Sequence, residues 1–141
     1  MANVHKDFHG CFSYALKFLY EEFGFSEVEE YLRRIARNVY APLIESLRSR
    51  GLPALKKHLE NVMVLEEADF DLQYKRGNLL LIVKKCPALH HMRARGYEVF
   101  EQFCESTRIV NEEICRQAGY KATVKYDQLK GTCTQCFQKE K

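Results

Sequence analysis

Hydrophobic positions recur at helical spacing through the first half of the chain. The first run ends at Gly24 and has these members: Phe12, Ala15, Leu16, Leu19, Tyr20 and Phe23. The second run has these members: Val28, Tyr31, Leu32, Ile35, Val39, Leu43 and Leu47. Because apolar residues every three or four positions place one apolar stripe on a helix, both runs predict amphipathic helices.

Local signals set the expected ends of these helices. Ser26 and Glu29 predict a capping box at the start of the second helix, in which each side chain satisfies the other's free backbone amide. Pro42 should kink or split that helix just before its own position, because proline has no amide hydrogen to donate. Pro53 suits the first turn of a third helix that reaches about Leu65.

The second half of the chain changes to an alternating pattern. Residues 70–74 alternate between apolar and polar, as in a strand with one buried face. The turn signal at residues 76–78 leads to a second strand over residues 79–85, which predicts a hairpin. Residues 120–126 and 132–138 predict a second hairpin in the same way.

Two helices are expected between the hairpins. Residues 90–95 form a short one, and a longer one runs from about Val99 to Gln117. We therefore predict a single α+β domain over residues 1–141. Its mainly helical part, residues 1–66, precedes a hairpin–helix–hairpin part, residues 67–141, whose strands form an antiparallel sheet with the long helix between the hairpins.

Composition fits a globular protein, with 46% hydrophobic and 29% charged residues. The net charge of +3 rests on 22 basic and 19 acidic residues without a basic block, so we expect no nucleic-acid partner. The longest apolar run, residues 79–83, is too short to span a membrane. Residues 1–5 lack the features of a secretory signal, so we expect a cytoplasmic protein whose six cysteines are reduced.

The most visible motif is the CxxC sequence at Cys133 and Cys136. In a strand, two residues three positions apart face opposite sides of the sheet. A second CxxC, which would complete four zinc ligands, does not occur in the sequence. We therefore favour one buried and one partly exposed thiol over a zinc knuckle or a redox pair.

One edge of the predicted long helix combines chemically useful side chains. Phe100, Phe103, Thr107, Val110 and Ile114 form its expected core stripe. Beside that stripe lie Cys104, Arg108, Asn111 and Cys115. Arg108 can bind a carboxylate through two hydrogen bonds, and Asn111 can orient a polar group. The alternative is that the cysteines pack as small hydrophobic residues and Arg108 pairs with Glu105 or Glu112.

Cys86 ends a predicted buried strand, a position that commonly faces a cleft. His90 and His91 follow it closely, so Cys86, Cys104 and Cys133 could form a thiolate metal site with either histidine. Alternatively, Cys86 is a nucleophile with a histidine as its base. The remaining possibility is that both histidines are surface or packing residues.

His5 and His9 flank Asp7 near the N-terminus. If the segment is helical, the two imidazoles share one face at a spacing that can bind a divalent ion. Asp7 as a helix N-cap is the simpler interpretation.

The order of these motifs resembles that of the L-2-amino-thiazoline-4-carboxylic acid hydrolase family. The resemblance covers about residues 68–138 and rests on Cys86-Pro87, Cys104 and the segment from Gly131 to Phe137. The layout is more distantly similar to four-vinyl-reductase, heme–nitric-oxide-binding and transport-particle ligand-binding folds. The charge-rich connection between Cys86 and Cys104, and the presence of Cys115 and Cys136, depart from the pattern.

The resemblance implies a small-molecule pocket between the sheet and the helices, near Cys86, Cys104 and Cys133. It also implies hydrolysis of a carbon–nitrogen bond in a small cyclic amino acid. The expected roles are catalytic for Cys86, Cys104 and Glu112, ligand-binding for Thr107, Arg108 and Asn111, and metal-binding, with zinc or iron, for Cys86, Cys104, Cys133, His90 and His91. A second hypothesis is a non-catalytic module that senses a ligand or a metal. A third is an interaction subunit that forms a homodimer through its helical half, as transport-particle relatives do.

Overall fold

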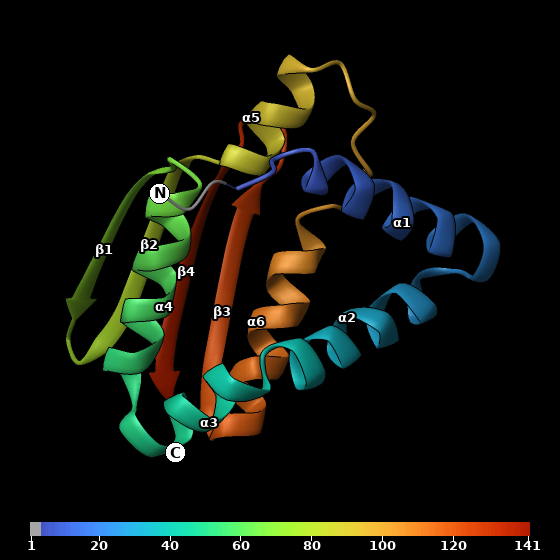
Figure 1. Cartoon of the computed structure of the whole chain (residues 1–141). Coiled ribbons are helices and arrows are strands. Elements are labelled where there is room, and N and C mark those ends of the chain that lie inside the picture. Colours follow the sequence, from blue (N-terminus) through green and yellow to red (C-terminus); the bar gives the residue numbers. More distant parts are fainter. Residues whose placement is uncertain (1–3) are drawn as a thin grey trace.

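The computed structural model describes residues 4–141, so the first three residues of the N-terminal segment that we interpreted as lacking an export signal lie outside the described residues. Within this range the chain forms six helices and four strands. Their bounds are α1 Phe8–Phe23, α2 Phe25–Val39, α3 Ala41–Arg50, α4 Leu52–Leu65, β1 Asp69–Lys75, β2 Asn78–Lys85, α5 Pro87–Ala94, α6 Glu105–Ala118, β3 Tyr120–Asp127 and β4 Thr132–Lys139. The predicted α+β class is confirmed (Figure 1).

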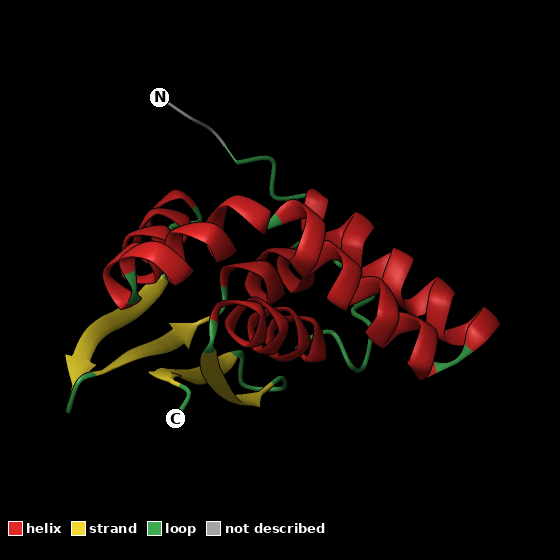
Figure 2. Cartoon of the chain, turned by 90° about the horizontal axis from the view of Figure 1, so that it is seen from below, coloured by secondary structure: helices red, strands yellow, loops and turns green. Residues whose placement is uncertain are grey.

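The four strands form one antiparallel sheet in the order β1-β2-β4-β3. The two hairpins join through β2 and β4, where Leu81 lies opposite Gln135 and Val83 opposite Cys133. The described helices cover one face of the sheet and leave the other open, so the molecule has two layers (Figure 2). Alternation therefore decides which side chains of each strand enter the interior.

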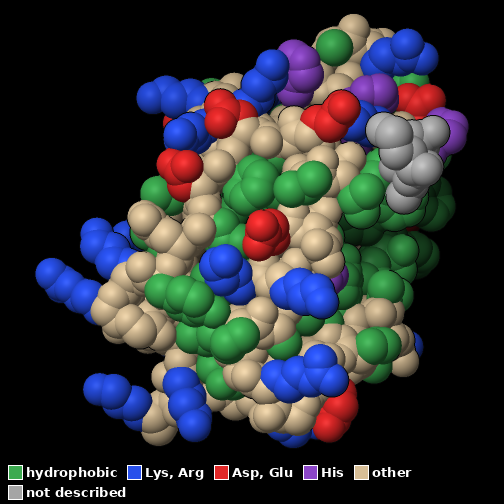
Figure 3. Space-filling model, turned by 60° about the vertical axis from the view of Figure 1, so that its left-hand side comes forward, with side chains coloured by type: hydrophobic (Ala, Val, Ile, Leu, Met, Phe, Trp, Pro, Cys, Tyr) green, Lys and Arg blue, Asp and Glu red, His purple; other side chains and the backbone are tan. Residues whose placement is uncertain are grey.

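β1 is an edge strand and lies at the side of the molecule that Figure 3 brings forward. This face carries lysine and arginine side chains among hydrophobic ones, with histidine and acidic side chains at its upper end. Among the helices that the structure describes, none is long and apolar enough to cross a membrane.

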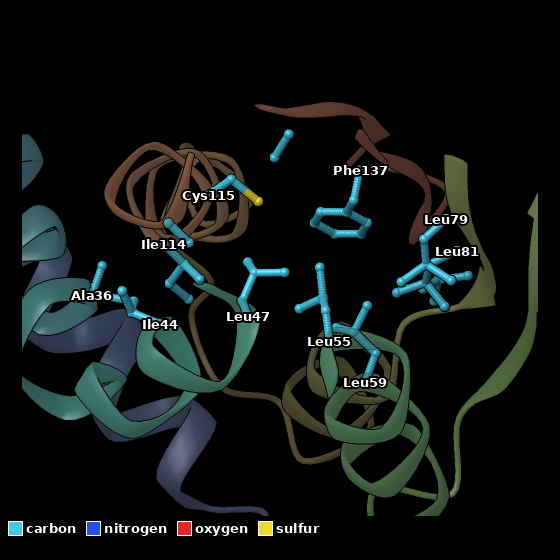
Figure 4. Close-up of a cluster of buried hydrophobic side chains, with 13 residues drawn as sticks. Ala36, Ile44, Leu47, Leu55, Leu59, Leu79, Leu81, Ile114, Cys115 and Phe137 are labelled. Atoms are coloured by element: carbon cyan, nitrogen blue, oxygen red, sulfur yellow. The ribbon is translucent and has the colours of Figure 1, made fainter. Parts of the chain in front are cut away.

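The core has two parts. The first lies between the sheet and helices α3, α4 and α6, and Figure 4 shows Phe137 pointing from the sheet into it, near Leu47 and Leu55. The second lies among α1, α2, α5 and the segment before α6, and includes Leu16, Met92 and Ile109. Cys86 and Val110 pack against both parts and so mark the boundary between them.

Three predicted helix starts are wrong. The short helix predicted from residue 90 begins at Pro87, because proline suits the first turn of a helix. Helix α2 begins at Phe25 directly after Gly24, whose φ of 90° makes the sharp turn, and no side chain caps it. Ser26 therefore lies inside the first turn, and the predicted capping box does not form. The predicted split before Pro42 is confirmed, since α2 ends at Val39 and α3 begins at Ala41.

The long helix between the hairpins starts at Glu105, not near Val99. The side chain of Gln128 holds the preceding segment in a non-helical path. Its amide donates to the Phe100 carbonyl at 2.9 Å, and its oxygen accepts from the Cys104 amide at 3.0 Å. Because these contacts replace hydrogen bonds within a helix, Phe100 fills the core from an irregular segment and Phe103 from a turn.

Candidate functional site

Cys86 lies where β2 passes into α5 and is the N-cap residue of that helix. Its amide donates to the Gly131 carbonyl at 2.8 Å, which ties the start of α5 to the turn between β3 and β4. Gly131 has a φ of 72°, a left-handed conformation that glycine adopts without strain. A backbone hydrogen bond thus joins Cys86-Pro87 to the segment that begins at Gly131, which are two of the motifs on which the resemblance rests.

Cys104 immediately precedes α6 and receives its position from Gln128, as described above. Cys133 lies on the inward face of β4, opposite Val83 on one side and Tyr126 on the other. The Gln135 amide donates to the Cys133 sulfur at 3.3 Å, and the Asn111 amide in turn donates to the Gln135 oxygen at 2.8 Å. Asn111 therefore binds a side chain of the protein, and its expected contact with a ligand stays a prediction.

Cys86, Cys104 and Cys133 converge from three elements that are distant in sequence, and we call them the thiol cluster. Cys86 and Cys133 pack against the first part of the core, and Cys86 and Cys104 pack against the second. Burial raises the pKa of Cys104 to about 12, and the charges of Cys86 and Cys133 raise it further. Burial likewise raises the pKa of Cys133, with a smaller effect of Cys86. All three cysteine residues are partly exposed.

Cys86 has the most mixed environment of the three. Burial raises its pKa, whereas the backbone amides of Leu89 and Ala88 at the start of α5 act in the opposite direction. The nearby Glu66 carboxylate raises this pKa and Arg93 lowers it. The balance is a raised pKa, so the Cys86 thiol is protonated at neutral pH.

The motif partner of Cys133 lies on the other side of the sheet. Cys136 lies opposite Leu80 and Thr123. It faces the open side of the sheet, because an odd number of positions separates it from Cys133. The expected separation of the CxxC sulfurs is confirmed. A hollow of about 390 Å³ at this end of the sheet is lined by residues of β2, β3 and β4, and neither Cys86 nor Cys104 is among its lining residues in the described range. The lining residues are Ile82, Val83, Lys84, Lys125, Tyr126, Asp127, Thr132, Cys133 and Thr134.

Arg108 pairs within the protein. Its guanidinium donates to both oxygens of Glu105 at 2.8 Å and to Glu112 at 3.0 Å, so both expected ion pairs are present together. Glu105 also accepts from the Tyr126 hydroxyl at 2.9 Å. These contacts place Arg108 and Glu112 beside the start of α6, and Thr107 is half-buried on the same helix. Cys115, by contrast, is fully buried in the first part of the core.

The predicted histidines belong to a different surface. His90 and His91 line a cleft of about 550 Å³ together with Lys6, Glu66, Glu67, Asp69, Lys85, Pro87 and Ala94. We call this the histidine cleft; it occupies the region of Figure 3 where histidine and acidic side chains gather. None of the three clustered thiols is among its lining residues in the described range.

Contacts with the N-terminal segment hold two lining residues of the histidine cleft, His91 and Glu66. Asp7 accepts from His91 at 2.9 Å and from the Tyr97 hydroxyl at 2.8 Å, and His9 and Glu66 lie 2.8 Å apart. Asp7 does occupy the N-cap position of α1, but its side chain makes no capping bond. His5 precedes the helix, so the expected shared face of His5 and His9 is wrong.

Across residues 4–141, no group of three or more His, Cys, Asp or Glu side chains is arranged to hold a metal ion. The arrangement described here therefore does not fit the expected metal site, and we derive no step through zinc or iron.

Two positioning residues escaped the sequence analysis. Glu113 of α6 has no exposed surface and bonds to Arg33, Arg37 and Arg116, which fixes α6 against α2. Its place in a 106–109–113 stripe was the available signal. Gln128 lies in a turn, and its link to Cys104 depends on a contact 24 residues away. No sequence pattern marks such a contact.

Comparison with known proteins gives no assignment: the chain matches no protein-family model, and a search of curated proteins finds no match either.

Proposed function

We propose that this chain is a small-molecule pocket protein whose ligand binds at the thiol cluster. The observation that carries the proposal is the convergence of Cys86, Cys104 and Cys133 at the boundary between the two parts of the core. Cys86 packs against both parts of the core, Cys133 against the first part and Cys104 against the second. Small-molecule sites are typically lined by apolar side chains with a few polar groups among them.

The surroundings define the kind of ligand. Burial keeps the three thiols protonated, so they offer neutral, polarisable contacts to an apolar or sulfur-containing portion. Tyr126 and Glu105 lie at the edge of the cluster and offer hydrogen bonds to a polar portion. A ligand carboxylate would have to displace Glu105 or Glu112 from Arg108.

The resemblance to the L-2-amino-thiazoline-4-carboxylic acid hydrolase family favours hydrolysis of a carbon–nitrogen bond in a small cyclic amino acid. Cys86 is the best placed nucleophile, because the amides of Leu89 and Ala88 would stabilise its thiolate. For that role the thiol must lose its proton once the ligand is bound, since the resting form is protonated.

A non-catalytic ligand-sensing role is the second candidate. Its support is the raised pKa of all three thiols, which suits binding better than nucleophilic attack. The two roles share one site and differ in whether the ligand is consumed.

Incubation of the purified protein with L-2-amino-thiazoline-4-carboxylic acid separates them. Mass spectrometry would follow the gain of one water, and calorimetry would follow binding. Cys86→Ser should abolish turnover, whereas Cys136→Ser, the same change on the open face, should keep it. Binding without turnover would select the sensing role for this compound. A wild-type protein that neither binds nor hydrolyses it would contradict the hydrolase assignment.

A further inference from the structure

Strand β1 is a free edge of the sheet, with β2 as its neighbour on one side. Figures 1 and 2 show none of the other described elements on its outer side. Its inward side chains are incompletely covered, since Tyr74 is 48% exposed and Phe70 and Leu72 are half-buried. On β2, by contrast, the inward residues Leu79 and Leu81 have no exposed surface. The inward row of β1 therefore has room for a neighbouring strand.

The turn at the end of β1 determines which backbone groups of the strand are free. Arg76 and Gly77 have positive φ values of 54° and 79°, as in a two-residue hairpin turn that joins a hydrogen-bonded pair, here Lys75 and Asn78. Backbone hydrogen bonds alternate in direction along an antiparallel strand. The N–H and C=O groups of residues 70, 72 and 74 therefore point to the free edge, where another antiparallel strand can pair with them.

The charged side chains of β1 make this edge complementary to itself. Asp69 and Lys75 occupy the two ends of the strand, and neither forms an ion pair among residues 4–141. Asp71 lies between them and pairs with Lys84 at 3.1 Å. If a second β1 pairs antiparallel about Leu72, each Asp69 lies opposite the partner's Lys75. Charges at a sheet edge normally discourage pairing, but in this register the charges that meet have opposite signs.

The same register covers the inward row of β1. Each Phe70 lies opposite the partner's Tyr74, and the two Leu72 side chains meet at the twofold axis. Aromatic pairs directly opposite each other stabilise antiparallel strands, and all three residues whose backbone groups are free take part in the pairing.

The other edge of the sheet, β3, is not complementary to itself. Antiparallel pairing of two β3 strands about Thr123 would place Lys121 against the partner's Lys125. Like charges directly opposite each other destabilise a sheet. Charge therefore favours β1 over β3 as the edge that meets a second copy.

We propose that two copies of this chain associate by antiparallel pairing of their β1 strands about Leu72, which joins two four-stranded sheets into one. The twofold contact closes on itself, because each copy uses its only β1 edge. This contact lies on the sheet, whereas the homodimer of our third hypothesis uses the helical half. It does not rest on the ligand proposed for the thiol cluster.

Sedimentation of the chain over a dilution series tests the association. The wild type should reach twice the 16.6 kDa mass of one copy. Lys75→Asp should raise the dissociation constant at least about tenfold, because two aspartates then face each other at both ends of the contact. The charge swap Asp69→Lys, Lys75→Asp should restore the wild-type value. Lys125→Asp, the same change on β3, should leave it unaltered.

Three outcomes of the dilution series would overturn the proposal. The first is a wild type that stays monomeric, and the second is a dimer that Lys75→Asp does not weaken. The third is a loss of affinity that the charge swap does not restore, since each aspartate would then face some group other than the partner's residue 69.

Cysteine cross-linking tests the register independently of these charges. The experiment uses Cys11→Ser chains, which lack the exposed native thiol. Air oxidation of a mixture of Asp71→Cys and Gln73→Cys chains should give a covalent dimer, because positions 71 and 73 face each other at a pair without backbone hydrogen bonds. Gln73→Cys alone should give none. Efficient cross-linking of Gln73→Cys alone would place the axis at position 73 and contradict this register, and a mixture that does not cross-link would contradict strand pairing.

Discussion

The carboxylate of Glu113 on α6 accepts a hydrogen bond from Arg37 on α2 at 3.2 Å, although the Glu113 side chain has no exposed surface. Arg33, Arg116 and Gln117 bind the same carboxylate. The arginines themselves keep some solvent contact. The bond network therefore holds one buried anion among partly hydrated cations and fixes the helix that carries Cys104 at its start.

Glu113→Gln should destabilise the fold by about 2–3 kcal/mol, because it leaves the arginines facing a neutral group in a site built for an anion. The expected loss of stability is smaller than for a fully buried ion pair, since the arginines can regain water. Urea unfolding would measure the loss. Glu45→Gln, which affects the exposed pair with Arg48, should cost less than about 0.5 kcal/mol. Equal effects of the two substitutions would show that Glu113 has no special role.

Stability should fall on acidification through the titration of Glu113. Burial alone would raise its pKa, but hydrogen bonds from Arg116, Gln117 and Arg37 hold the pKa at about 2, against 4.5 for an ordinary glutamate. Because the folded pKa is the lower one, the contribution of Glu113 is present above pH 4.5 and is lost as the pH falls toward 2. The stability difference between wild type and Glu113→Gln should shrink over this interval. A difference that is constant with pH would contradict the ionised form.

The clustered thiols should react slowly with iodoacetamide at neutral pH. Burial raises the pKa of Cys86, Cys104 and Cys133, and the reactive thiolate is therefore scarce. The exposed Cys11 should be alkylated first. Peptide mapping after timed labelling of the native protein would give the order. Alkylation of Cys86 or Cys104 ahead of Cys11 would mean that a thiolate is already present.

Gln128→Ala should loosen the segment that leads into α6. The substitution removes the bonds to the Phe100 carbonyl and the Cys104 amide, for a loss of about 1–3 kcal/mol. Hydrogen exchange at the Cys104 amide should accelerate. Gln73→Ala, at an exposed position of β1, is the matched control and should change neither quantity. Unchanged exchange at Cys104 would show that Gln128 does not hold this segment.

Glu67 occupies a left-handed position, with a φ of 58°, directly after α4. The Ala68 amide bonds to the Met63 carbonyl there, as in a helix end that normally uses glycine. Both Glu67→Gly and Glu67→Ala lose the exposed contact with Lys6, so their difference isolates the backbone. Glu67→Gly should be the more stable by about 1 kcal/mol in urea unfolding. Equal stabilities would contradict the strained position.

The sequence predicted the elements well where one periodicity continued without interruption. The alternation of residues 120–126 and 132–138 correctly separated Cys133 from Cys136. It failed where a distant side chain competes with local helical bonds, as Gln128 does before α6. The sequence pattern also did not mark Glu113, because its pairing with α2 depends on how the helices pack.

The candidate site was predictable in part for the same reason. The sequence predicted that Cys86, Cys104 and Cys133 lie near one pocket. Cys86 and Cys104 do lie at the boundaries of elements, and Cys133 lies at an inward position of its strand. His90 and His91 were expected beside these thiols because they are near in sequence. Helix α5 instead turns them toward the N-terminal segment, where Asp7 binds His91.

The central claim is that a small molecule binds at the thiol cluster, and mapping of backbone amide shifts by NMR tests it most directly. On titration with L-2-amino-thiazoline-4-carboxylic acid, the largest shifts should fall on the amides of Cys104, Cys133 and Tyr126, and Cys86→Ser should weaken them. Shifts confined to Glu67, Asp69 and His91 would place the ligand in the histidine cleft and contradict the claim, and so would a spectrum that the compound leaves unchanged.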